Sequence, residues 1–180
     1  YAKRIEYRYQ EFPEPTVILM CGLPGSGKSY IAHKLARFLD VPLFRSDVIR
    51  KRMSFSEDTY TWENRDCVYD RLMELGSKAL KEGKSCILDA TFLSRVERDK
   101  ARALGPSLIL HPIVSDEAAY ARLSRRNHTV SEADCSVYDI CKQAFEDFSD
   151  NERASLIQVN GEDPLSFEGA YSLIAKKHLN

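Results

Sequence analysis

Short apolar runs alternate with longer amphipathic stretches along the chain. Each run holds four to six residues and is bounded by glycine, proline or polar residues, which is typical of strands buried on both faces of a sheet. We expect strands at residues 16–20, 41–44, 85–90, 108–113 and 156–159.

The segments between these runs carry apolar residues at helical spacing. We expect helices at residues 26–39, 48–53, 60–81, 96–104, 116–126, 131–148 and 167–177. Regular alternation of strands and helices predicts an α/β fold, with a parallel sheet of about five strands sandwiched by helices and joined by right-handed crossovers.

Composition narrows the class of protein without identifying a partner. The 180 residues are 43% hydrophobic and 29% charged, as expected for a folded domain, and the net charge is −1, so no overall positive field attracts nucleic acid. No apolar run reaches the ~18 residues of a membrane span, so we expect no membrane partner. The five cysteines form no C-x-x-C pair, and we interpret them as reduced thiols of a cytoplasmic protein.

The first 15 residues differ in character from those that follow. They are rich in charged side chains and end in Pro13-Glu14-Pro15. We interpret residues 1–15 as a linker to an upstream domain, and residues 16–180 as one domain.

The clearest motif follows the first expected strand and opens a helix. It matches the pattern G-x-x-x-x-G-K-[ST] and comprises Gly22, Leu23, Pro24, Gly25, Ser26, Gly27, Lys28 and Ser29. Glycines let successive backbone N–H groups point at phosphate oxygens, and the helix N-terminus adds partial positive charge. Lys28 is expected to reach the β- and γ-phosphates, and the Ser29 hydroxyl to bind Mg²⁺. The motif therefore predicts a nucleoside triphosphate, ATP or GTP, together with Mg²⁺.

Asp47 and Arg50 follow the second expected strand. In an open α/β sheet the carboxyl ends of the strands line the ligand crevice, so Asp47 is expected near the phosphate loop. A carboxylate there can accept the proton of an attacking hydroxyl, and Arg50, three residues on, can hold a phosphate of the acceptor. The alternative is that Asp47 or Ser46 caps a helix and that the basic residues around it form a solvated face.

Asp89 ends the third expected strand. This is the usual place for a carboxylate near Mg²⁺ in phosphate-loop proteins, and its alternative is a turn or cap residue. Thr91, Arg95 and Arg98 follow and are candidates for the acceptor groove, although each is equally compatible with an ordinary surface position.

Three arginines end the helix expected at residues 116–126. Arg122 and Arg126 are four residues apart and therefore project from one face, with Arg125 beside them. Arginines on a mobile lid stabilise the charge that spreads over the γ-phosphate during transfer. A solvated basic helix end is the alternative, because cations are favourable at helix C-termini.

Taken in order, four motifs and a later helix carrying Gln143 resemble the P-loop polynucleotide kinase-like family, a group of ATP-dependent kinases that neighbours the zeta toxins. The resemblance covers about residues 17–159 and rests on the segments GLPGSGKS, RSDVIRKRM, ILDATFLSRVER and ARLSRRNHTVSEAD. At two positions, Val48 after Asp47 and Phe92 after Thr91, the sequence is more similar to the broader kinase group than to the characterised nucleic-acid enzymes.

The resemblance implies a role for each candidate residue. Lys28 and Ser29 would serve the phosphates and Mg²⁺, and Arg122 and Arg126 would bracket the donor phosphates. On the acceptor side the implied roles are a general base at Asp47, a phosphate ligand at Arg50, and support of the metal or the acceptor by Asp89, Thr91 and Arg95.

These residues favour a P-loop kinase whose acceptor is the 5′-OH of DNA or RNA. A polynucleotide path needs a basic groove, which the sequence offers locally at Arg45, Arg50, Lys51, Arg52, Arg95 and Arg98. The near-neutral charge favours instead a kinase for a sugar, a nucleotide sugar or an antibiotic. Two further classes stay open. One is a nucleotide-dependent ATPase or switch with no acceptor. The other is an inactive binding module, but the intact set of candidate residues argues against that class.

Overall fold

The computed structural model describes residues 11–53, 62–126 and 132–179. Its centre is a five-stranded sheet in the order β2-β3-β1-β4-β5, with every neighbouring pair parallel. The strands are β1 (Val17–Met20), β2 (Leu43–Arg45), β3 (Cys86–Asp89), β4 (Ser107–Ile113) and β5 (Leu156–Asn160). The predicted α/β class and parallel sheet are therefore confirmed.

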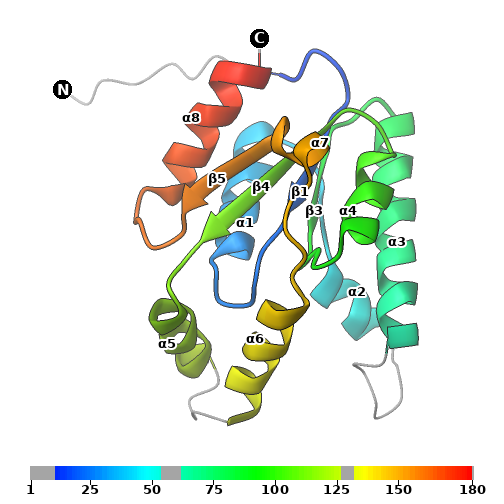
Figure 1. Ribbon diagram of the computed structural model, residues 1–180. Helices are drawn as coiled ribbons and strands as arrows, with labels where there is room; N and C mark the ends of the chain where they lie inside the picture. The colour runs from blue at the N-terminus through cyan, green and yellow to red at the C-terminus, as the bar shows by residue number, and fades with distance from the viewer. Residues whose placement is uncertain (1–10, 54–61, 127–131, 180) are drawn as a thin grey trace, which may run out of the picture.

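Helices cover both faces of the sheet (Figure 1). On one face lie α1 (Lys28–Leu39) and α8 (Ser166–His178), and on the other lie α3 (Trp62–Lys81) and α4 (Arg95–Arg102). The remaining helices surround the carboxyl ends of the strands or lead back into the sheet: α2 (Ser46–Arg52), α5 (Asp116–Arg126), α6 (Glu132–Ala144) and α7 (Asp150–Arg153).

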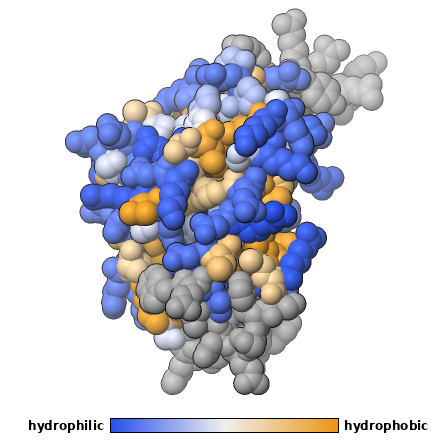
Figure 2. Space-filling view, turned by 90° about the vertical axis from the view of Figure 1, so that its right-hand side faces the viewer, coloured by the Kyte–Doolittle hydropathy of each residue, from blue (hydrophilic) through white to orange (hydrophobic). Residues whose placement is uncertain are grey.

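The alternation of side chains along each strand explains the two cores. In β1, Val17 and Leu19 join the apolar cluster beneath α3, while Ile18 and Met20 join the cluster beneath α1 and α8. Because both faces of these strands are buried, their sequences are continuously apolar rather than alternating. The outer surface on the side of α3 and α4 is mostly hydrophilic, with hydrophobic residues scattered across its middle (Figure 2).

One predicted helix is wrong in extent. The sequence suggested a single helix over residues 131–148, but α6 ends at Ala144 and an extended connection leads to the short helix α7. Phe145 and Phe148 turn inward and pack against the ring of His111, with ring centroids 5.5 and 5.0 Å away. A capping box formed by Ser149 and Glu152 then starts α7. The predicted start at residue 131 lies outside the described residues.

The segment before the first strand is partly packed on the domain. Phe12 contacts the apolar cluster beneath α1 and α8, and the Thr16 hydroxyl donates a hydrogen bond to the Glu14 carbonyl, 2.9 Å away. The division into a linker at residues 1–15 and a domain at residues 16–180 stays a prediction. None of the described helices is both long and apolar enough to cross a bilayer.

Candidate active site

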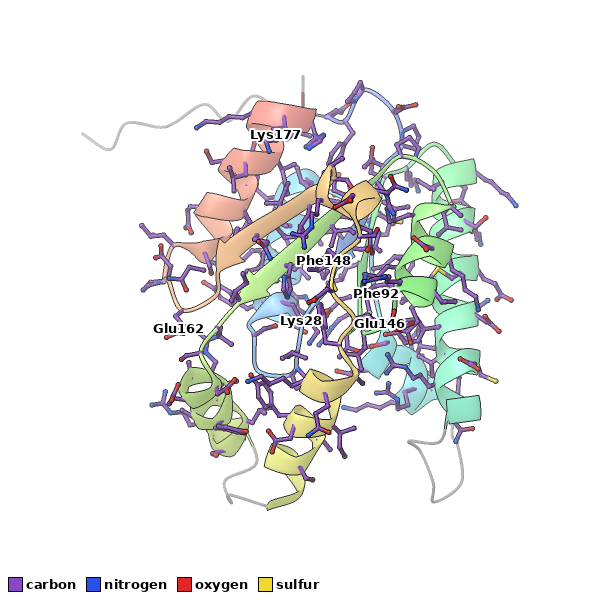
Figure 3. The ribbon with its side chains drawn as sticks, viewed as in Figure 1. Lys28, Phe92, Glu146, Phe148, Glu162 and Lys177 are labelled. Atoms are coloured by element: carbon purple, nitrogen blue, oxygen red, sulfur yellow. The ribbon has the colours of Figure 1, made fainter. Side chains whose placement is uncertain are left out.

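The phosphate loop joins β1 to α1, as the motif requires. Gly25 and Gly27 have positive φ angles of 79° and 88°, which side chains other than glycine rarely adopt. A Cβ atom at Gly25 would lie 2.9 Å from the carbonyl oxygen of Ala119 in α5. The loop is therefore tightly bent and in direct contact with α5. Lys28 begins α1, in the middle of the molecule and at the carboxyl ends of the strands (Figure 3).

Asp89 lies beside the phosphate loop and is only 3% exposed. Its Oδ2 atom accepts hydrogen bonds from Ser29 Oγ at 2.8 Å and from Arg45 Nε at 3.1 Å. Its Oδ1 atom is also buried, yet it has no hydrogen-bond partner among the described residues. A buried, unsatisfied carboxylate oxygen is costly, so it indicates a bound group that is not part of the chain.

The Ser29–Asp89 pair fits Mg²⁺, which prefers a few oxygen ligands and keeps the rest of its shell for water and phosphate. The described residues contain no cluster of three or more histidine, cysteine, aspartate or glutamate side chains that could hold a metal ion. The metal roles predicted for Ser29 and Asp89 are thus compatible with their geometry and remain predictions.

Asp47 and Arg50 lie together on the first helix after β2. Arg50 Nη1 donates to Asp47 Oδ1 at 2.9 Å, and the Asp47 side chain is 64% exposed. The N-cap of α2 is Arg45, and no side chain makes a capping hydrogen bond there. The alternative interpretation of Asp47 or Ser46 as the helix cap is therefore wrong. Since Arg45 pairs in register with Asp89, the start of α2 lies next to the buried carboxylate.

Thr91 faces a polar cluster that the sequence did not reveal. Arg65 of α3 donates from Nη2 to the Thr91 hydroxyl at 3.3 Å and to the Tyr69 hydroxyl at 3.1 Å. Glu97 binds Arg65 through both carboxylate oxygens, at 2.7 and 3.0 Å. The Thr91 carbonyl accepts from the backbone N–H of Gly22 at 3.1 Å, which ties this cluster to the phosphate loop. No motif surrounds Arg65 in the sequence, so only its position identifies it.

The surroundings of Arg95 and Arg98 differ from those that the sequence predicts. Arg95 Nε donates to the Asp147 carbonyl at 2.9 Å, so its guanidinium is engaged with the connection between α6 and α7. Its acceptor role stays a prediction. Arg98 is fully buried and paired with Glu152, so both its assignment to the acceptor groove and the alternative surface position are wrong. Phe145 and Phe148 cover its guanidinium, with ring centroids 5.5 and 4.8 Å away.

Arg122 connects two loops that are far apart in the sequence. Its Nη1 atom donates to the Gly25 carbonyl at 3.2 Å and its Nη2 atom to the Gly161 carbonyl at 2.6 Å. In this state the guanidinium binds protein carbonyls beside the phosphate loop. Arg126 is the last residue of α5, and its side chain lies outside the part of the chain that the structure describes. Its predicted contact with the donor phosphates stays a prediction.

A groove of about 460 Å³ opens next to Arg122, lined by Gly27, Tyr30, Arg125 and the turn after β5. The turn is held by Glu162, whose Oε1 accepts from the Ser115 N–H at 2.6 Å (Figure 3). This hydrogen bond lowers the pKa of Glu162 below its ordinary value. The sequence does not indicate a role for this turn, because the turn carries no phosphate-binding or catalytic motif.

Helix α6 faces the phosphate loop from the opposite side. Burial raises the pKa of the Cys141 thiol more than the positive charges of Arg65 and Lys28 lower it. The thiol therefore lies within electrostatic reach of both the loop and the Arg65 cluster. A cavity of about 240 Å³ lies between the phosphate loop and α6, beside the carboxyl end of β4, and its lining includes Leu23, Ser26, Tyr138 and Lys142. Ligands of open α/β sheets bind at this end of the strands.

A phosphate loop between the first strand and a helix, with a buried carboxylate on the adjacent strand, defines the class of P-loop kinases and related phosphate-loop enzymes. The model of a family described as an AAA domain matches residues 17–148. The chain belongs to this family of P-loop kinases and is an enzyme of that class.

Two solved structures share the fold over most of their length. A gluconokinase from Sinorhizobium meliloti 1021 is 20% identical, with a TM-score of 0.72 over 92% of this chain and 94% of that one. A sugar kinase from Janibacter sp. HTCC2649 is 25% identical, with a TM-score of 0.70 over 89% of this chain and 94% of that one.

A curated relative matches a shorter part of the chain. The 6-phosphofructo-2-kinase/fructose-2,6-bisphosphatase 3 of Bos taurus is 32% identical over 100 residues, which are 47% of this chain. The match covers only 22% of that protein's length.

Proposed function

We propose that this P-loop kinase transfers the γ-phosphate of ATP to a hydroxyl group of a sugar or a sugar derivative. The observation that carries the proposal is the placement of two half-sites at adjacent strand ends. Ser29 and Asp89 form the donor half, and Asp47 with Arg50 forms the acceptor half on the helix that directly follows β2.

In the proposed reaction, a carboxylate oxygen of Asp47 takes the proton of the acceptor hydroxyl. The oxygen of the acceptor hydroxyl then attacks the γ-phosphorus, the bond from phosphorus to the β–γ bridging oxygen breaks, and ADP leaves. Lys28 and the N–H groups of the phosphate loop stabilise the charge on the transferred group. Ser29 and Asp89 would hold Mg²⁺, which would supply further neutralisation of the phosphate charge.

We further propose that the nucleotide base lies in the groove beside Arg122 and the turn after β5. The groove adjoins Gly27, at the end of the phosphate loop, and is bordered by a planar guanidinium. A planar cation of this kind stacks favourably on an aromatic ring.

The engagement of several arginines supports a small acceptor over a polynucleotide. Of the basic residues that the sequence offered for a nucleic-acid groove, Arg45 binds Asp89, Arg95 binds a backbone carbonyl and Arg98 is buried. A polynucleotide path needs solvent-facing cations aligned along the backbone, and these three do not supply them. The similarity to a sugar kinase at 25% identity points the same way.

The direct test is transfer of labelled γ-phosphate from ATP to a panel of acceptors. The panel contains sugar acids, hexoses, sugar phosphates and a 5′-OH oligonucleotide, and free phosphate is measured in parallel. Label on a sugar or sugar acid supports the proposal. Label on the oligonucleotide restores the polynucleotide interpretation, and release only as free phosphate indicates an ATPase.

A matched pair of variants tests the proton acceptor. Asp47→Asn is expected to reduce transfer by a factor of about 100 or more, the usual contribution of a general base, with little change in ATP affinity. Asp99→Asn is the control, because Asp99 is 65% exposed and pairs with Arg102 at the same i,i+3 spacing on another helix. Equal turnover in the two variants would exclude Asp47 as the base.

A further inference from the structure

A further groove lies at the β2 edge of the sheet. Its volume is about 610 Å³, and residues of α1, β2, α2 and α3 line it. Strand β2 lies at one end of the strand order and pairs only with β3. An edge strand presents unpaired backbone N–H and C=O groups, which natural proteins normally cover or protect with charge.

The floor of this groove is apolar and partly open to solvent. Leu43 and Phe44 of β2 contribute to it, together with Val41, Val48 and Leu75. All five side chains are partly or largely exposed, and the exposed fraction of Val48 reaches 37%. Apolar side chains gathered in one concave surface favour an occupant that has apolar groups of its own.

The rim of the groove is positively charged. Arg37 of α1 and Arg52 of α2 line it, with His33 and Arg45, and Asp40 is the one acidic residue among the described residues of the lining. Neither Arg37 nor Arg52 forms an ion pair or a side-chain hydrogen bond with any other residue that the structure describes. Two unpaired arginines on opposite walls of one groove therefore favour an anionic occupant.

We propose that this groove binds an acidic, extended segment of a partner protein. The segment adds a strand to the free edge of β2, places apolar side chains on the floor and sets its carboxylates against Arg37 and Arg52. Addition of a strand to an exposed edge is an established mode of peptide recognition, in which backbone hydrogen bonds give affinity and side-chain pockets give specificity.

Two other occupants fit the groove less well. Single-stranded nucleic acid binds through aromatic stacking platforms, whereas the described residues of the floor include one aromatic ring, Phe44, among aliphatic side chains. A second copy of the chain pairing through its own β2 would bring Arg37 and Arg52 against the same two residues. Like charges placed opposite each other in this way are unfavourable.

Occupancy of the groove is connected to the active site through Arg45. This residue lines the groove and also donates from Nε to the buried carboxylate of Asp89. A partner carboxylate that draws the Arg45 guanidinium toward the groove would weaken its hydrogen bond to Asp89. A bound segment is therefore expected to change kinase turnover.

The test measures binding of a fluorescent peptide of alternating valine and glutamate to the whole chain by fluorescence anisotropy. We expect saturable binding that weakens as salt is added, and no binding of the peptide in which lysine replaces glutamate. A peptide methylated on alternate backbone nitrogens cannot pair with β2 and is expected to lose at least tenfold in affinity. Equal affinity of the methylated peptide would refute strand addition.

Charge-reversal variants locate the site. Arg37→Glu combined with Arg52→Glu is expected to weaken binding at least tenfold. Lys176→Glu combined with Lys177→Glu makes the same charge change on the exposed end of α8, distant from the groove (Figure 3), and is expected to change affinity less than twofold. Equal losses in the two double variants would overturn the proposal.

Two further outcomes would also overturn it. One is tighter binding of a single-stranded oligonucleotide that competes with the peptide and depends on the same arginines. The other is a dimer in sedimentation experiments that dissociates when Arg37 and Arg52 are reversed.

Discussion

The buried ion pair between Arg98 and Glu152 allows a quantitative test of the revised role of Arg98. Arg98 Nε lies 2.5 Å from Glu152 Oε1, and both side chains have no exposed surface. Arg98 also donates to the carbonyls of Phe92 and Leu93 at 3.0 and 3.1 Å, in the loop that follows Asp89. Further bonds reach the carbonyls of Glu146 and Asp147, so one side chain joins three segments of the chain.

Removing one partner of such a pair leaves an uncompensated buried charge. We therefore expect Glu152→Leu to lower the free energy of unfolding by ~3–5 kcal/mol. Arg98→Met also removes one donor from each of four backbone carbonyls, of which those of Phe92, Leu93 and Asp147 keep another donor among the described residues. Its loss should therefore reach the upper end of this range, about 5 kcal/mol. The double variant removes both charges together, and it should be more stable than the sum of the two single losses predicts.

The assay is urea unfolding at pH 7, followed by circular dichroism, for the wild type, both single variants and the double variant. Arg102→Met is the control on the same helix, because Arg102 pairs with the exposed side chain of Asp99 and makes one hydrogen bond to the Asn151 carbonyl, so its loss should cost no more than about 2 kcal/mol. A loss below about 1 kcal/mol for Arg98→Met, together with weaker acceptor binding, would contradict the structural role and restore the acceptor role.

Three further predictions follow from the phosphate loop and from His111. Lys28→Ala should reduce turnover strongly and weaken ATP binding, as measured by transfer kinetics and calorimetry; wild-type turnover would exclude its contact with the transferred phosphate. Gly25→Ala should weaken ATP binding at least tenfold, because its positive φ of 79° and the Ala119 carbonyl 2.9 Å from the new Cβ force the loop to shift; unchanged affinity would show that the loop adapts freely. Burial and the nearby Arg98 charge lower the pKa of His111 to about 4, from 6.5. The unfolded chain therefore binds a proton at this histidine more readily than the folded chain does. The free energy of unfolding should be independent of this group above about pH 6.5 and fall by up to ~3 kcal/mol as the pH drops toward 4. A His111→Phe variant should not show this dependence in urea unfolding at different pH values, and an unaltered dependence in that variant would assign it to other groups.

The parts of the fold that follow from local patterns could be predicted from the sequence. The five apolar runs became the five strands, and the glycine-rich motif joins a strand to a helix as its chemistry requires. The end of α6 could not be predicted, because residues 145–148 look helical and turn inward only to pack on His111 and Arg98. That packing depends on strands and helices distant in the sequence.

The candidate site shows the same division between local and long-range information. The sequence predicted Ser29 and Asp89 separately as residues near Mg²⁺, and the structure brings their side chains within 2.8 Å of each other. It failed for Arg98, because an arginine with a buried partner 54 positions away has the same local sequence as one at the surface. It also missed Arg65 and Gly161, whose relevance comes only from their contacts with Thr91 and Arg122.

The two hydrogen bonds of Arg122 bear on how long a fragment of the chain must be in order to bind nucleotide. The family match ends at residue 148, whereas the Gly161 carbonyl that holds Arg122 lies beyond it. A Cβ at Gly161 would also lie only 2.5 Å from the Ser26 carbonyl, so this turn rests directly on the phosphate loop. A fragment trimmed to the matched region would keep every residue of the glycine-rich motif and lose the turn that supports it. We therefore expect the smallest nucleotide-binding unit to extend through β5 to Gly161, with the C-terminal strand supporting the proposed donor site as much as the motif itself.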